Sequence, residues 1–267
     1  MMKIVVCVKQ IQDPEIPASK FLLDTEGKHV VQPEGIPPVI NPYDEQAVEL
    51  AVRIKEKHGG MITILSIGNE SASSTVKRAL AMGADRGIIL RDPQFEDSDS
   101  FSTAYILSQA IRKIGEFDLV LCGRQAADWD EGLVGSILAE NLDLPLVTLA
   151  ESAELVQGRW HVKRAILDGF QVFGVSPPAV LTVSHELGPP RLPSGWGIIT
   201  ASKKEIPFWD AKTIGAEPIL IGSGCSRKQL VRLRIPSRER MCEKIAGETP
   251  QEKADGLLEK MKEAGVL

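Results

Sequence analysis

The sequence of 267 residues lacks the signatures of the commonest nucleotide-binding enzymes and of metal sites. It has no Gly-x-x-x-x-Gly-Lys-Ser/Thr and no Gly-x-Gly-x-x-Gly after its first apolar run, which excludes the two standard phosphate-binding loops. Its four cysteines show no Cys-x-x-Cys spacing and its four histidines are scattered. We therefore expect reduced, unpaired thiols and no metal site.

Positive charge and long apolar runs are also scarce. The formal charge is -5 and the isoelectric point is about 5.5, which argues against nucleic acid as the main partner, because phosphate binding needs clustered Lys and Arg. The amino-terminal apolar run Ile4 to Val8 is too short for a signal-peptide core or a membrane span. We expect a cytoplasmic protein with no membrane span, in which this run is the first strand.

What the sequence does contain is a repeated alternation of apolar runs and amphipathic stretches. The runs predict strands at 3–8, 61–67, 87–90 and 118–122, and the amphipathic stretches predict helices at 42–58, 76–82, 101–114 and 133–142. Units of this length favour a doubly wound, mostly parallel sheet with right-handed crossovers, an α/β fold. The long connection over 9–38 carries two short runs, 20–23 and 29–31, that we expect to pair as a hairpin.

Polar residues follow three of the predicted strands and open the first helix. Asn41 and Pro42 predict a sharp helix start, with Asn41 as N-cap. The run 118–122 gives way at Gly123 to a polar loop that reaches Gly135. Because the carboxyl ends of parallel strands share one edge of a sheet, we expect these segments to meet there. Backbone N–H groups at such an edge suit a phosphate, so a nucleotide held mostly by main chain is predicted.

The pattern changes after residue 149. Short alternating runs at 153–157, 160–167 and 171–175 predict antiparallel hairpins, and 179–183 predicts a buried strand. The segment 186–197 is expected to be a loop, and its apolar Leu192 and Trp196 have no core to enter. We divide the chain into an α/β domain, 1–225, and a carboxyl-terminal arm, 226–267. The arm holds a basic run (Arg227, Lys228, Arg232, Arg234, Arg238 and Arg240) and a last helix after Thr249 and Pro250.

Four motifs in order resemble the beta subunit of electron transfer flavoprotein. They are Val5-Val6-Cys7-Val8-Lys9-Gln10, Asn41-Pro42-Tyr43-Asp44-Glu45-Gln46-Ala47-Val48-Glu49, Ala79-Leu80-Ala81-Met82-Gly83-Ala84-Asp85-Arg86 and Gly123-Arg124-Gln125-Ala126-Ala127-Asp128. The resemblance is strong over residues 3–149, thins in the middle and returns at 234–267. It implies an electron carrier subunit rather than an enzyme, with an adenine nucleotide alpha-hydrolase-like fold.

The resemblance also implies partners and a nucleotide site. An alpha subunit would hold most of a redox-active FAD and receive the last helix of the arm, and a flavin-dependent dehydrogenase would exchange electrons with the pair. The beta subunit's own site holds AMP in one branch of the family and a second FAD in another. The matching residues here are Cys7, Lys9, Asn41, Pro42, Tyr43, Asp44, Ile67, Gly123, Arg124, Gln125, Ala126, Ala127, Asp128, Asp130, Gly132, Leu133 and Val134.

The loop after Gly123 has one feature that favours a second FAD and others that favour AMP. Its Gly-Arg-Gln head is similar to the branch with a second FAD, but that branch usually continues Asp-Gly-Asp-Thr-Ala-Gln-Val-Gly. Here Trp129 stands in place of the first of those glycines, and Glu131 adds a negative charge beside the predicted phosphate site. Taking the bulk of Trp129 as decisive, we favour AMP, with a second FAD as the alternative.

Several roles remain open from the residues alone. Arg124 could stabilise an anion or pair with Asp128 or Asp130, and Lys9 could meet a phosphate or extend to solvent. In the family, a leucine of a Leu-Pro-Asn-Ile motif recognises the dehydrogenase. Here the matching place reads Gly195-Trp196-Gly197-Ile198, and Ala165 replaces a usual glutamate. We therefore expect a partner other than an acyl-CoA dehydrogenase, gripped by Trp196 or Leu192.

Two other classes share this fold and stay open as alternatives. A hydrolase of the adenine nucleotide alpha-hydrolase type is expected to have a Ser-Gly-Gly-rich phosphate loop after its first strand, where this chain has Lys9-Gln10-Ile11-Gln12. A nucleotide-sensing module is expected to be a compact homodimer without the segment 234–267.

Overall fold

The computed structural model describes residues 1–235 and 242–267. The strands are β1 (Lys3–Cys7), β2 (Gln10–Ile11), β3 (Leu22–Leu23), β4 (Val30–Val31), β5 (Val39–Ile40), β6 (Met61–Ile67), β7 (Arg86–Leu90), β8 (Leu119–Gly123), β9 (Leu146–Val156), β10 (Arg159–Ile166), β11 (Gly169–Val175), β12 (Ala179–Val183) and β13 (Phe208–Trp209). The α-helices are α1 (Pro42–His58), α2 (Ser73–Met82), α3 (Ser100–Ile114), α4 (Val134–Leu142), α5 (Gly195–Ser202), α6 (Ala211–Ile214) and α7 (Pro250–Glu263). Short 3-10 turns are η1 (Ala18–Lys20), η2 (Glu70–Ala72), η3 (Pro93–Phe95), η4 (His185–Leu187) and η5 (Pro218–Leu220).

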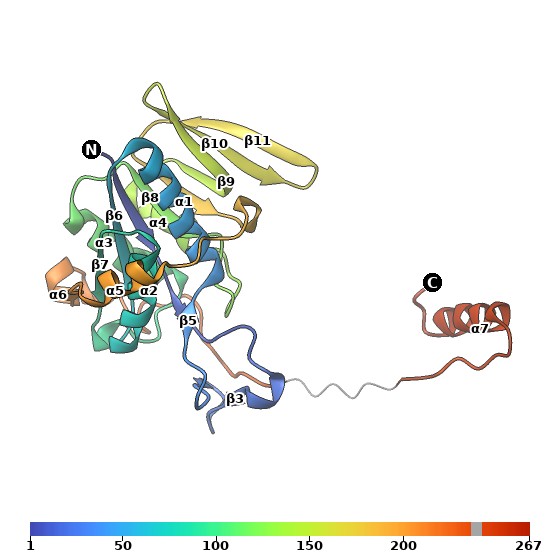
Figure 1. Cartoon of the computed structure of the whole chain (residues 1–267). Helices are drawn as coiled ribbons and strands as arrows, with labels where there is room; N and C mark the ends of the chain where they lie inside the picture. Colours follow the sequence, from blue (N-terminus) through green and yellow to red (C-terminus); the bar gives the residue numbers. More distant parts are fainter. Residues whose placement is uncertain (236–241) are drawn as a thin grey trace.

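A nine-stranded sheet in the order β11-β10-β9-β12-β8-β1-β6-β7-β13 forms the body (Figure 1). From β9 through β12, β8, β1, β6 and β7 to β13 every neighbouring pair is parallel. The chain runs outward from β1 through β6 to β7 and then returns to the other side of β1 as β8. This reversal places the topological switch point between β1 and β8, where open α/β sheets bind their ligands.

Helices cover both faces of the sheet, which confirms the doubly wound α/β fold. The apolar sides of α1 and α2 pack with one set of strand side chains, including Ile4, Val6 and Ile64. The apolar sides of α3 and α4 pack with the alternate set, including Val5 and Leu65. Successive strand residues point to opposite faces, so strands covered on both sides must be apolar throughout, and β1 shows this pattern.

The antiparallel part of the sheet begins with a longer strand than expected. The alternating run predicted at 153–157 is the second half of a longer strand, because β9 continues from Leu146 to Val156. Its first half pairs in parallel with β12 and its second half antiparallel with β10, and the register shifts near Ala150, where Leu149 has φ 57°. A bulge therefore lets one strand serve two neighbours. The pairing of β10 with β11 confirms the predicted hairpin.

Several short segments were missed, among them β13 and α6, and one segment was assigned wrongly. The hairpin of β3 and β4 is confirmed, but β13 and α6 fall in a stretch where no element was predicted. β13 has only two residues and takes its register from β7 at the edge of the sheet, so local sequence carries little signal. The segment 186–197 is not all loop, because Ser194 caps α5 by accepting a hydrogen bond from the N–H of Gly197.

The last helix begins as predicted, with Thr249 as N-cap and Pro250 in the first turn. None of its residues is buried, and in Figure 1 it stands apart from the sheet. Arg238 and Arg240 of the predicted basic run lie outside the described residues. No helix in the described ranges is both long and apolar enough to cross a membrane. The division of the chain at 225/226 stays a prediction.

Candidate functional site

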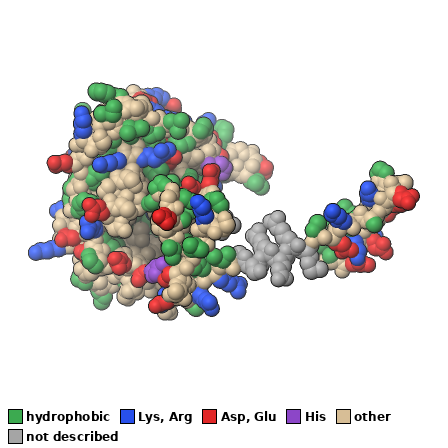
Figure 2. Space-filling view, turned by 60° about the horizontal axis from the view of Figure 1, so that its bottom comes forward, with side chains coloured by type: hydrophobic (Ala, Val, Ile, Leu, Met, Phe, Trp, Pro, Cys, Tyr) green, Lys and Arg blue, Asp and Glu red, His purple; other side chains and the backbone are tan. Residues whose placement is uncertain are grey.

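A cavity of about 1050 Å³ opens at the carboxyl edge of the sheet. Cys7, Ile67 and Cys122, from β1, β6 and β8, line it together with the loop between β8 and α4 and the start of α3. Figure 2 turns this edge forward and shows acidic and basic side chains interspersed around it. The predicted meeting of three strand ends is therefore confirmed.

Asp44 ties the start of α1 to two of these strand ends. Its side chain is buried, and its two carboxylate oxygens accept hydrogen bonds from the backbone N–H of Lys9 (2.7 Å) and of Gly123 (3.0 Å). Burial raises the pKa of Asp44 to about 7, although the two N–H donors oppose the shift. Gly123 must be glycine, because a Cβ there would lie 2.5 Å from the Asp44 carboxylate and 2.7 Å from the Tyr43 carbonyl carbon.

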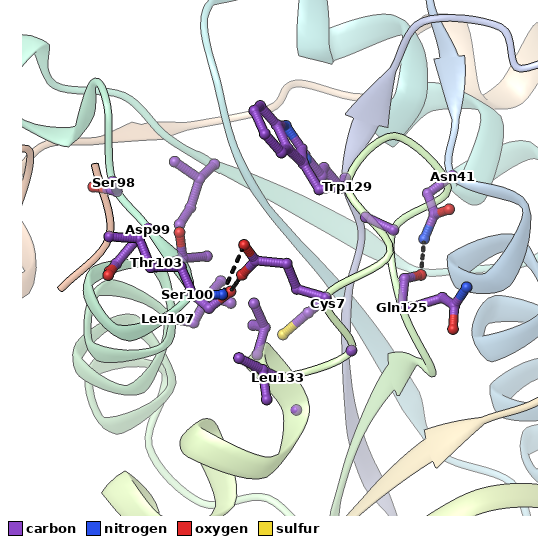
Figure 3. A pocket seen from close by; sticks show the side chains of 18 of the residues that line it. Cys7, Asn41, Ser98, Asp99, Ser100, Thr103, Leu107, Gln125, Trp129 and Leu133 are labelled. Carbon is purple, nitrogen blue, oxygen red and sulfur yellow. Dashed lines mark hydrogen bonds and ion pairs between the residues drawn. The ribbon is translucent and has the colours of Figure 1, made fainter. Parts of the chain in front are cut away.

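Asn41 holds the loop between β8 and α4. Its amide nitrogen donates to the carbonyl of Gln125 (2.8 Å), and its amide oxygen accepts from the N–H of Ala127 (3.1 Å). Asn41 is the N-cap residue of α1, as predicted, but its side chain makes no capping hydrogen bond, because both of its polar atoms are engaged across the cavity edge. Figure 3 shows Asn41 facing Gln125 at one side of the pocket.

The same loop is held by two further polar pairs. Lys9 forms a 2.6 Å ion pair with Asp128, and Gln125 donates to Asp130 over 2.7 Å. Asp130 has φ 54°, in the left-handed region, and its N–H and that of Trp129 both donate to the Ala126 carbonyl. These contacts determine where Trp129 stands, at the open side of the cavity, with 52% of its surface exposed.

Arg124 is placed differently from either structural alternative. Its Nε donates to the Gln125 side chain (3.1 Å), and its guanidinium lies 5.7 Å from the centre of the Tyr43 ring. Of the two roles left open, pairing with Asp128 or Asp130 is not found, because those carboxylates are taken by Lys9 and Gln125. Within the described residues Arg124 forms no ion pair, so its positive charge is available to an anion in the cavity.

The floor of the cavity, at Cys7, Ile67 and Cys122, is apolar. The neighbouring thiol of Cys7, together with burial, raises the pKa of Cys122, so that Cys122 is a thiol at neutral pH. Beyond them α4 begins at Val134, and no side chain in the described part of the chain caps it. Its first N–H groups therefore face the cavity without a side-chain acceptor, the arrangement that attracts phosphate.

The segment 222–230 also lines the cavity, and it contacts the loop between β8 and α4 through Lys228. The Gly222 N–H donates to Ser98, and the Arg227 N–H donates to Asp99 (2.6 Å). Lys228 forms a 2.9 Å ion pair with Glu131, whose carboxylate also accepts from the hydroxyl of Ser100. The Ser100 hydroxyl and then Lys228 hold the pKa of Glu131 below its ordinary value, so Glu131 is charged at neutral pH.

Most of the predicted site residues line this cavity. Those that do are Cys7, Lys9, Asn41, Asp44, Ile67, Gly123, Arg124, Gln125, Ala126, Gly132, Leu133 and Val134. Five others do not line it: Pro42, Tyr43, Ala127, Asp128 and Asp130. Tyr43 lies under Arg124, and Asp128 and Asp130 hold the loop. That these residues bind a nucleotide stays a prediction.

One side of the cavity was missed. Phe95, Ser98, Asp99, Thr103 and Leu107, from the segment between β7 and α3 and from α3 itself, line it (Figure 3). They do so together with Ser223, Ser226, Lys228, Gln229 and Leu230. The polar run at 97–100 follows a predicted strand, so the rule applied to the other three strand ends would have found it. No local signal brings residues 222–230 there, because the N–H groups of Gly222 and Arg227 find their acceptors, Ser98 and Asp99, more than 100 positions away in the sequence.

Comparison with known proteins decides the family. The electron transfer flavoprotein domain matches residues 28–214. A chain from Thermoanaerobacterium thermosaccharolyticum named electron transfer flavoprotein subunit beta is 37% identical over 267 residues, covering all of both chains. The chain belongs to the electron transfer flavoprotein beta-subunit family. It is thus an electron carrier subunit rather than a catalytic enzyme, as its motifs suggested.

Two further members of the family carry names tied to reductases. The caffeyl-CoA reductase-Etf complex subunit CarD of Acetobacterium woodii is 35% identical over 267 residues and covers the full length of both chains. The acryloyl-CoA reductase electron transfer subunit gamma of Anaerotignum propionicum is 32% identical over 283 residues, again over both full lengths. The family thus includes chains named as parts of larger redox assemblies.

The predicted partner-recognition residues lie away from the cavity. Leu192 and Trp196 are 84% and 78% exposed, and α5 adds the exposed Ile198 and Ile199 beside them. Arg191 anchors this segment to α1: its backbone N–H (3.1 Å) and its Nε (2.8 Å) donate to Glu49, and its other nitrogens reach Glu56. The exposed apolar side chains are therefore presented from a fixed support.

Proposed function

We propose that the chain pairs with the alpha subunit of an electron transfer flavoprotein, which holds most of a redox-active FAD, and that the pair shuttles electrons between a flavin-dependent dehydrogenase and other carriers. The names of the CarD and acryloyl-CoA reductase relatives support a dehydrogenase partner. The exposed apolar group around Trp196 supports a docking role for α5, because such side chains have no use in a free surface.

We further propose that the cavity binds a second FAD. The volume of about 1050 Å³ carries this choice, since it lies at the upper limit of the roughly 300–1,000 Å³ of small-molecule sites. AMP is only one part of FAD, which adds a second phosphate, a ribityl chain and the three fused rings of the isoalloxazine. A mononucleotide would leave most of the space to water.

This choice reverses the preference for AMP that the sequence favoured. That preference assumed that Trp129 fills the space of a ligand, but its indole is half exposed and stands at the open side of the cavity. The charge of Glu131, the second reason for AMP, is already paired with Lys228. AMP remains the second candidate, because the adenosine part of either molecule would find the same apolar floor.

The residues present fit such a group. The uncapped start of α4 and the guanidinium of Arg124 would hold its phosphates, and Cys7, Ile67 and Leu107 would surround an aromatic ring. When bound, FAD would supply one- and two-electron chemistry. The chain's own part is to bind it, to orient it through the loop held by Asn41, and to exclude water from the floor.

Extraction of the purified pair tests the proposal. The chain is co-expressed with its alpha subunit, the complex is denatured in acid, and the released nucleotides are separated by chromatography. We expect two FAD for each pair and no AMP. One FAD with one AMP would select the AMP candidate, whereas a colourless complex would contradict both.

The remaining assignments belong to the same proposal. The helix α7, whose surface is exposed throughout, would dock on the alpha subunit as the end of an arm that follows the domain 1–225. The dehydrogenase would contact Leu192 and Trp196. The pair would work in the cytoplasm, where Cys7, Cys122, Cys225 and Cys242 stay reduced.

A further inference from the structure

One large aromatic side chain of the cavity has no structural task. Of the four tryptophans, Trp160 is fully buried in the core, and Trp196 belongs to the exposed apolar group of α5. Trp209 packs against the core on the face of the sheet that α3 and α4 cover, with the ammonium group of Lys113 over its ring. Trp129 instead lines the cavity with half of its surface exposed. Figure 3 shows the indole standing free in the open part of the pocket, uncovered by the other side chains drawn.

The loop presents this indole in a fixed position. Asn41 holds the backbone at Gln125 and Ala127, and Lys9 holds Asp128, the residue before the tryptophan. The N–H of Trp129 itself donates to the Ala126 carbonyl. Because the loop already fixes this ring, little conformational entropy is lost when a ligand packs on it. The exposed indole is therefore a preorganised contact surface.

The two ends of the cavity differ in exposure to solvent, and this difference determines the orientation in which a dinucleotide would bind. The floor, at Cys7, Ile67 and Cys122, is apolar and closed by the sheet, so a ring placed there cannot approach another protein. The uncapped start of α4 lies along the cavity wall and suits the phosphates. A ring that exchanges electrons must lie near the surface, which leaves the adenine for the floor and the isoalloxazine for the open side, where Trp129 stands.

We propose that Trp129 stacks on the isoalloxazine ring of a flavin bound in this cavity and thereby selects FAD over AMP. The inference rests on the proposed second FAD. An electron-rich indole and an electron-poor oxidised flavin attract each other face to face, and stacking on an aromatic side chain contributes measurably to nucleotide binding. AMP lacks the isoalloxazine, so Trp129 contributes nothing to its affinity. The residue that seemed to exclude FAD on grounds of size is thus the one that favours it.

The test uses the complex with the alpha subunit, freed of the nucleotide in the beta-subunit cavity, and the variants Trp129→Ala and Trp129→Phe. Titration calorimetry measures binding of FAD and, separately, of AMP. We expect Trp129→Ala to weaken FAD binding about tenfold, the Phe variant to weaken it less, and AMP binding to stay within twofold of wild type. Fluorescence of the added FAD should be quenched by the wild-type complex and recover in Trp129→Ala.

The variant Trp196→Ala is the matched control, because it removes another exposed indole that does not line the cavity. Equal FAD affinity and equal quenching in Trp129→Ala and wild type would overturn the inference and leave the proposed second FAD intact. Equal weakening of FAD and AMP would also overturn it, since the stacked ring would then be adenine. A wild-type complex that takes up AMP but no FAD would overturn the proposed function and this inference together.

Discussion

The backbone N–H of Gly123 donates a 3.0 Å hydrogen bond to the carboxylate of Asp44, a residue 79 positions earlier in the chain. The bond joins the end of β8 to the first turn of α1, and the other oxygen of the same carboxylate joins the end of β1 through Lys9. One buried side chain thus connects the three segments that border the cavity. Changes at Asp44 should therefore alter both the stability of the fold and the binding of a ligand.

The charge of Asp44 should make stability depend on pH. Burial raises its pKa in the folded protein to about 7, whereas its ordinary value is 3.8. Between these two values the folded chain binds more protons than the unfolded chain, so this group stabilises the fold at low pH and its contribution falls as pH rises from about 4 to 7. Urea unfolding of wild type and Asp44→Asn should show this difference.

The Asn variant cannot lose a proton, so the free energy of unfolding of Asp44→Asn relative to wild type should increase over that range. The substitution adds a loss that does not depend on pH, because one of the two N–H donors at Lys9 and Gly123 then lacks an acceptor. A difference that does not change with pH would show that Asp44 does not titrate there.

Gly123→Ala should damage the cavity without touching a ligand. The new Cβ would lie within 3 Å of the Asp44 carboxylate and of the α1 backbone, so β8 and α1 must separate. We expect a loss of about 1–3 kcal/mol in unfolding free energy and weaker nucleotide binding. Gly224→Ala is the control, since nothing lies within 4 Å of its Cβ position; equal effects of the two substitutions would contradict the packing explanation.

The ion pair of Arg191 and Glu49, which anchors the α5 segment, should contribute more to the free energy of unfolding than an ion pair on the surface. The Glu49 side chain is only 4% exposed and accepts from both Arg191 and Arg53. Arg191→Ala leaves this carboxylate half-satisfied, and we expect a loss of about 3 kcal/mol in thermal or urea unfolding. Lys57→Ala, which breaks an exposed pair with Glu154, should cost less than about 1 kcal/mol. A similar cost for both would argue against burial as the cause.

The ion pair of Glu131 and Lys228 should tune affinity for phosphates. Glu131→Gln removes a negative charge from the cavity wall and should tighten nucleotide binding by a few-fold, whereas Lys228→Met should weaken it. Both effects should shrink in high salt, because the pair is partly exposed. Lys260→Met on α7 makes the same change of charge away from the cavity and should leave the affinity unaltered. Salt-independent effects would point to altered packing instead.

Local sequence was a good guide wherever a single segment determines its own structure. The Asn41-Pro42 start, the glycines after His58 and the apolar run 61–67 predicted α1 and β6 closely, because capping, helix termination and strand burial depend on neighbouring residues. The polar residues after three strand ends predicted most of the cavity, because a parallel sheet brings such ends to one edge.

The failures share a different physical cause. Asn41 was expected to cap its own helix, but its amide finds Gln125 and Ala127, partners that only the β1–β8 pairing brings near. For Arg124 one of the two alternatives was a carboxylate of its own loop, but Lys9, which follows β1, takes one of these carboxylates. In each case the side chain or its expected partner contacts a residue that is distant in the sequence instead of a neighbouring one.

By itself the sequence determined the α/β class, most element boundaries and the family, because these follow from short-range periodicity and from motifs in order. Only the tertiary structure decided that residues between β7 and α3 and residues of the segment 222–230 line the cavity, and where Trp129 lies. A side chain's size is a local property, but whether it fills a cavity or borders one depends on how the loop that carries it is held. Hydrogen bonds from Asn41 and Lys9 hold that loop, and they exist only in the folded chain.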